Sequence, residues 1–189
     1  MKFLIVEPIE DKSLVQKNEG WILSEKIETG KGLYAAGIVL GIILAGIFSF
    51  IIKTTTLCKT LDFYVYKKII LFLLVIPLHE ISHIIFFPSL NNTVIGFSWK
   101  KGVFYVSSSE IFSKKRLLIT IILPFLLLTI IPYFFLYFIN SETIAYISLY
   151  NLIGSGIDLI TFFKILSITE GNQFRYNGTN LYFRKVSKE

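Results

Sequence analysis

The sequence predicts an all-α polytopic membrane protein with four transmembrane helices and one or two small β-hairpins on the cytosolic side. Composition is the first reason, because 53% of the 189 residues are hydrophobic and only 17% are charged. The second reason is the length of the apolar runs, since about 20 apolar residues at ~1.5 Å per residue cross the hydrocarbon core of a bilayer. Polar segments separate these runs in a chain of one-domain length, so we expect a single membrane domain over residues 1–189.

The apolar runs define the expected elements in chain order. They predict spans at about 32–52, 69–87, 117–139 and 143–163, between polar tails at 1–31 and 164–189. In the first span, Gly37, Gly41 and Ala45 recur every four residues. Small residues at this spacing favour close packing against another helix within a membrane.

Two segments outside the spans have the pattern of β-hairpins. Residues 93–98 and 103–107 are rich in β-branched and aromatic side chains and flank the short polar segment 99–102. In the carboxyl-terminal tail, Asn177 and Gly178 lie between two aromatic-rich runs, a strong signal for a two-residue hairpin turn.

Charge and cysteine content narrow the classes of partner. The formal net charge of +6 suits contact with anionic lipid headgroups, so the lipid bilayer is the first expected partner. No basic helix, zinc knuckle or RNP-like run is present, so we expect no nucleic acid partner. The single cysteine, Cys58, excludes internal disulfides and a zinc site built from cysteines.

The distribution of basic residues predicts the orientation. With four spans, both tails and the long loop between the second and third spans share one side, and they hold 15 of the 19 Lys and Arg residues. The positive-inside rule then places both termini in the cytosol, in a multi-pass protein of the cell (cytoplasmic) membrane.

The second span contains the sequence HEISH, a match to HExxH formed by His79, Glu80 and His83. These are the only two histidines of the chain, and they lie within an apolar run where ionisable groups are costly. Residues i and i+4 share one helix face, so His79 and His83 can both bind one Zn²⁺ ion. Glu80 is then the candidate general base for a zinc-bound water. The alternative is two packed histidines and a buried acid that neighbouring helices satisfy.

The fourth span supplies the candidate third ligand, Asp158. His83 lies four residues, and Asp158 five residues, before the end of its expected span, so the two share nearly the same depth. The alternative for Asp158 is a buried acid bonded to Asn151 or Ser155 of the same span, and Glu110 in the long loop is the alternative third ligand. Asn151, seven residues before Asp158, is a candidate for contact with a substrate carbonyl or the oxyanion, or for a helix-to-helix hydrogen bond.

These motifs resemble those of a known group of proteins. HEISH in one span, with the later sequence NLIGSGID (Asn151 to Asp158), resembles small bacterial zincin-type membrane peptidases and, more distantly, the site-2 protease type of intramembrane zinc metalloprotease. The resemblance covers residues 69–163. It implies that His79, His83 and Asp158 bind zinc and that Glu80 is catalytic.

The sequence therefore predicts a zinc metalloprotease that hydrolyses peptide bonds within or beside the membrane. Its expected substrate is a membrane protein or peptide. Two other classes remain open: a non-catalytic membrane binding or scaffold protein that retains a protease-like fold, and a metal transporter.

Overall fold

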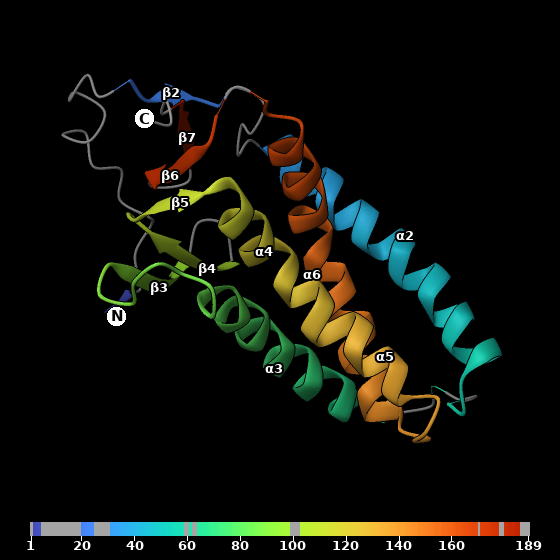
Figure 1. The fold of residues 1–189 in the computed structure, drawn as a ribbon. Coiled ribbons are helices and arrows are strands. Elements are labelled where there is room, and N and C mark those ends of the chain that lie inside the picture. The colour runs from blue at the N-terminus through green and yellow to red at the C-terminus, as the bar shows by residue number, and fades with distance from the viewer. Residues whose placement is uncertain are drawn as a thin grey trace. The chain divides into compact units, whose positions relative to one another are not determined.

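The computed structural model describes residues 2–4, 20–24, 31–58, 61, 64–98, 103–169, 171–177 and 180–185. Figure 1 shows the fold, with most of the helices and strands labelled. In chain order they are β1 (Lys2–Leu4), β2 (Ile22–Leu23), α2 (Lys31–Thr55), α3 (Val65–Ile84), β3 (Thr93–Ser98), β4 (Val103–Ser108), β5 (Ile111–Ser113), α4 (Lys114–Phe125), the π-helix η2 (Leu126–Ile130), α5 (Ile131–Phe135), α6 (Glu142–Leu166), β6 (Gln173–Asn177) and β7 (Asn180–Arg184).

The chain divides into two compact units. The helical unit comprises Lys31–Ser82 and Ile122–Ile160, and the sheet unit comprises Met1–Gly30, His83–Ile121 and Thr161–Glu189. Helices α3, α4 and α6 each run without a break across a boundary between the two.

In the helical unit, α2 and α6 pack with their backbones in contact. A Cβ atom added at Gly156 of α6 would lie 2.8 Å from the Gly41 nitrogen and closer still to the Gly37 carbonyl oxygen of α2. Ala45, one turn after Gly41, is buried in the apolar cluster that also contains Leu149 and Leu152 of α6. The predicted role of the small-residue stripe in close helix packing is therefore confirmed.

Three of the described helical segments are long and apolar enough to cross a membrane, which indicates a membrane protein. They are Gly32–Thr55, Lys114–Phe135 and Glu142–Leu166. Four transmembrane helices were expected, but α3 is not among these three, because Lys67, Lys68 and Glu80 interrupt its apolar sequence. It also ends at Ile84 rather than at residue 87, since Pro88 disfavours helical backbone at the residue before it.

The third expected span, 117–139, is a helix with an interruption. It begins at Lys114 and ends at Phe135, and the π-helix η2 separates α4 from α5. At the end of η2, the N–H of Ile131 bonds to the Leu126 carbonyl five residues earlier. Pro132 follows directly and has no N–H with which to continue regular α-helical bonding. The widened turn places Thr129 in the buried interior of the helical unit.

Both predicted hairpins are confirmed, and each belongs to a larger sheet. β3 pairs antiparallel with β4 and parallel with β1. β6 pairs antiparallel with β7, and β5 and β2 extend this sheet to the order β2-β7-β6-β5. The predicted turn residues 99–102 and Gly178 lie outside the described residues. The chain is thus mostly helical, with two small sheets rather than one or two isolated hairpins.

The core of the sheet unit joins the second sheet to the ends of two helices. Phe112 of β5 and Phe174 of β6 are fully buried together with Leu117 of α4 and Ile165 of α6. At the start of α4, the Lys114 ammonium group donates to the Leu166 carbonyl at the end of α6 (3.0 Å) and to the Ile168 carbonyl two residues beyond it (2.6 Å). A cation in this position satisfies carbonyls that a helix end leaves without partners.

Candidate metal centre

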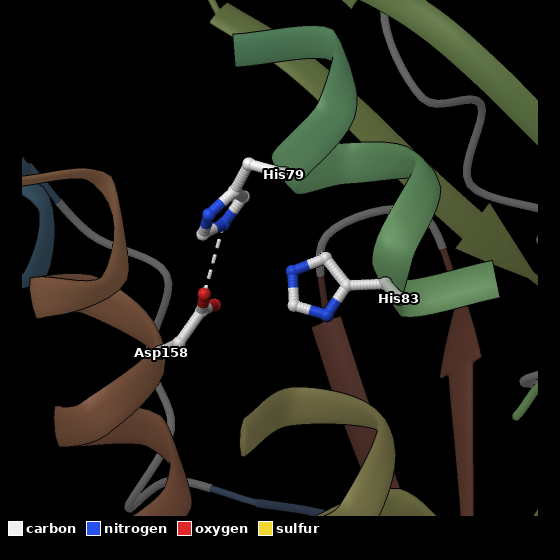
Figure 2. A group of neighbouring side chains, drawn as sticks. All are labelled: His79, His83 and Asp158. Atoms are coloured by element: carbon white, nitrogen blue, oxygen red, sulfur yellow. Dashed lines mark ion pairs between the residues drawn. The ribbon is translucent and has the colours of Figure 1, made fainter. Parts of the chain in front are cut away.

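The two histidines lie one turn apart on α3. His79 is buried and His83 half-buried, and both rings project from the same side of the helix, as Figure 2 shows. Because α3 runs without a break from one to the other, its regular geometry alone places them near each other. Glu80, the next residue after His79, is half-buried.

Asp158 of α6 meets His79. The distance from His79 Nε2 to Asp158 Oδ2 is 3.0 Å, drawn as the dashed line in Figure 2. The potential ligand atoms of His79, His83 and Asp158 all lie within 4.8 Å of one another. Among the described residues, this is the group of histidine, cysteine and acidic side chains that can hold a metal ion.

Asn151 of α6 is buried and forms a hydrogen bond with His79. Its amide nitrogen donates to the Pro124 carbonyl and to Thr129 Oγ1, each at 2.9 Å, and lies 3.2 Å from Ser155 Oγ. A carbonyl can only accept, so the NH₂ group of Asn151 must face Pro124 and the oxygen must face the other way. That oxygen lies 2.9 Å from His79 Nδ1. His79 therefore carries a proton on Nδ1 and donates it to Asn151.

The same reasoning fixes the tautomer of His83. Its Nδ1 lies 2.8 Å from the backbone carbonyl oxygen of Thr120 on α4. The carbonyl has no proton to give, so His83 Nδ1 is the donor. A neutral imidazole with its proton on Nδ1 has its lone pair on Nε2, the nitrogen it can offer to a metal.

These assignments allow a test of whether the site fits zinc. In their neutral forms, His79 and His83 both present Nε2 lone pairs, and ionised Asp158 presents a carboxylate oxygen. His79 Nε2 and Asp158 Oδ2 would repel each other at 3.0 Å without a cation between them. Two donors bound to one tetrahedral zinc stand about 3.3 Å apart, given bonds of about 2.0–2.2 Å. The His79–Asp158 separation of 3.0 Å is close to this value, and the ligand atoms of all three residues lie within 4.8 Å of one another. Two imidazoles with one carboxylate are ordinary zinc ligands.

The other candidate residues lie elsewhere. Glu110, between β4 and β5, accepts a hydrogen bond from the Asn92 amide (2.7 Å) and is not part of the group around His79. Asn151 is 1% exposed, and its oxygen and nitrogen both face protein atoms, so it contacts α3 and α4 rather than a space open to substrate.

Sequence reasoning missed three residues that support the histidines: Thr120, Pro124 and Thr129. Thr120 and Pro124 act through backbone carbonyls, which every residue type carries. Of the three, only Pro124 could have been found from the sequence. A proline inside a helix leaves the carbonyl four residues earlier without its helical hydrogen bond, and that residue is Thr120.

Comparison with known proteins identifies the family but no close relative. A search of curated proteins and a search of solved structures each found no match. A family model described as "Putative zincin peptidase" matches residues 72–172, which is more than half of the chain and includes His79, Glu80, His83 and Asp158. The chain therefore belongs to this zincin peptidase family.

Proposed function

We propose that this protein is a zinc-dependent peptidase that hydrolyses peptide bonds within or beside the membrane, as site-2 proteases do. The observation that carries the proposal is the meeting of His79, His83 and Asp158, whose ligand atoms lie within 4.8 Å of one another beside Glu80. Three protein ligands with one open position are the pattern of catalytic rather than structural zinc sites.

The residues have separate roles in this proposal. His79, His83 and Asp158 hold the ion, which when bound lowers the pKa of a water molecule and polarises the scissile carbonyl. Glu80 follows His79 directly on α3, and in this proposal its carboxylate takes the proton from the attacking water. It then gives that proton to the leaving amine. Asn151 and the Thr120 carbonyl keep the two rings in place.

Replacement of Glu80 by Gln tests this division of roles. Purified wild-type protein in detergent should bind about one zinc per chain and generate new peptide termini in a proteome-derived peptide library, read by mass spectrometry. Glu80→Gln should retain the zinc and generate none. A scaffold or a metal transporter has no need of this carboxylate, so hydrolysis that survives in Glu80→Gln, or a zinc-loaded wild type that cleaves nothing, would overturn the proposal.

We further propose that α3 crosses the bilayer as a fourth membrane helix, with both termini in the cytosol. Its 20 residues span about 30 Å, and its outer face is apolar, with Ile70, Leu73 and Leu74 each more than half exposed. Lys67 and Lys68 lie in its first turn, where long cationic side chains can reach the lipid headgroups. Reporter fusions at each terminus of the intact chain test this: signals from opposite sides of the membrane would refute it.

A further inference from the structure

Residue 124 of α4, a proline, is linked to the hydrogen bonds of both histidines. Pro124 has no N–H, so the helical bond from residue 124 back to the Thr120 carbonyl cannot form. An unpaired carbonyl in an apolar interior costs free energy, and one in a membrane helix is satisfied by a neighbouring group. Here that neighbour is His83, whose Nδ1–H donates to Thr120 O at 2.8 Å.

The carbonyl of Pro124 itself leads to the other histidine. It accepts a hydrogen bond from the Asn151 amide at 2.9 Å, which turns the Asn151 oxygen toward His79 Nδ1. Asn151 and Pro124 are fully buried, so no water competes for these bonds. Two carbonyls one helical turn apart on α4 thus each determine the protonated nitrogen of one histidine.

We propose that Pro124 is a positioning residue for both histidines: its missing N–H leaves the Thr120 carbonyl to His83, and its own carbonyl orients the Asn151 amide that holds His79. The consequence is that each ring gives its Nδ1–H to a fixed partner and presents Nε2, rather than Nδ1, as the nitrogen for a metal before one binds. The effect on metal affinity rests on the proposed zinc site, whereas the protonation pattern itself does not.

The test reads the protons directly. The chain has two histidines, so the ¹⁵N NMR spectrum of the metal-free, ¹⁵N-histidine-labelled protein in detergent contains the signals of two imidazoles. The spectrum of His79→Gln assigns each signal to its ring. Above the usual imidazole pKa, both rings of the wild type should carry a proton on Nδ1. A second proton on His79 Nε2, shared with Asp158, would not alter this result. A wild-type ring with Nδ1 deprotonated would overturn the proposal without any variant.

Two variants should separate the two halves of the proposal. Pro124→Ala restores an N–H that competes for Thr120 O but keeps the carbonyl at 124, so it should release His83 and leave His79 unchanged. Asn151→Leu should release His79 and leave His83 unchanged. Each should weaken Co²⁺ or Zn²⁺ binding about 10–100-fold, the usual effect of losing the partner of a ligating histidine.

Matched controls keep the result specific. Pro132→Ala makes the same change in α5, which supplies no partner to His83, so it should leave the His83 ring unchanged. Thr120→Val removes a buried hydroxyl that has no hydrogen-bond partner but retains the carbonyl, so it should also alter neither ring. If Pro124→Ala leaves His83 as in the wild type, or Thr120→Val changes it as much as Pro124→Ala does, the proposal is wrong. Protons on both Nδ1 atoms in a wild type that binds no zinc would instead refute the proposed function and uphold the positioning.

Discussion

Replacement of Gly156 by alanine should force α2 and α6 apart. The added Cβ would lie 2.8 Å from the Gly41 nitrogen and 3.0 Å from the Gly37 carbonyl carbon, with the Gly37 oxygen closer still. Ordinary contact begins at 3.4 Å, so the backbones have to separate by at least 0.6 Å. Backbone atoms cannot rotate away as a side chain can. Overpacking of this kind costs about 1–3 kcal/mol, which for a chain of this size lowers the melting temperature by roughly 2–12 °C.

The only cysteine provides the assay. Cys58 is fully buried in the same apolar cluster as Ala45 and Leu149, and burial, followed by the nearby charge of Glu142, raises the pKa of its thiol. A thiol-reactive fluorophore should therefore label the folded protein slowly and report its unfolding during a temperature ramp.

Gly46, a glycine of α2 that lies away from α6, is the matched control for this prediction. A Cβ at Gly46 meets nothing within 4 Å, so Gly46→Ala should leave the melting temperature unchanged or raise it slightly through helix propensity. Equal melting of wild type and Gly156→Ala would refute the backbone-contact reasoning. An equal loss in Gly46→Ala would do so as well, because the penalty would then not arise from the α2–α6 contact.

Three further substitutions test separate parts of the structure. Lys114→Met should speed amide hydrogen exchange at the end of α6, where two carbonyls lose their cationic donor, whereas exposed Lys115→Met should not. Thr129→Val removes the hydroxyl that accepts a hydrogen bond from the buried Asn151 amide, so it should lower the stability measured in the thiol assay by about 1 kcal/mol. An unchanged stability would refute this hydrogen bond. Asp158→Ala should lose most bound zinc by metal analysis, and Glu110→Ala should retain it; the opposite result would move the third ligand to the loop.

The parts of the site set by local periodicity were predictable. HExxH spacing brings His79 and His83 together on any regular helix, so no tertiary information was needed for that pair. The apolar runs likewise located α2 and α6, since length and composition alone determine whether a helix can cross a bilayer. Asp158 was a sound candidate because a lone acid in an apolar helix requires a partner, and His79 is the partner observed.

Features that depend on partners distant in sequence were not predictable. β2 and β5 have two and three residues, too few for a periodic pattern, and each forms only because β7 or β6 offers an edge. The carboxyl-terminal end of α3 was placed too late because hydrophobicity continues to Phe87, whereas the backbone restriction imposed by Pro88 ends the helix earlier, at Ile84. The sequence raised Asn151 as a polar residue of interest, but its role depends on which way its amide faces, and Pro124 decides that.

The hydrogen-bond donors and acceptors around the two histidines link the fold to the proposed chemistry. In an apolar interior each buried hydrogen-bond donor needs an acceptor. Asn151 accepts the hydrogen bond from His79 Nδ1, and the Thr120 carbonyl accepts the one from His83 Nδ1. What remains toward Asp158 is a set of electron-pair donors, and His79 Nε2 and Asp158 Oδ2 are 3.0 Å apart. A proton can bridge only two of these three residues, whereas one metal ion can bind all three. The hydrogen bonds to the Thr120 and Pro124 carbonyls thus orient a set of side chains that one metal ion can join before any substrate is present.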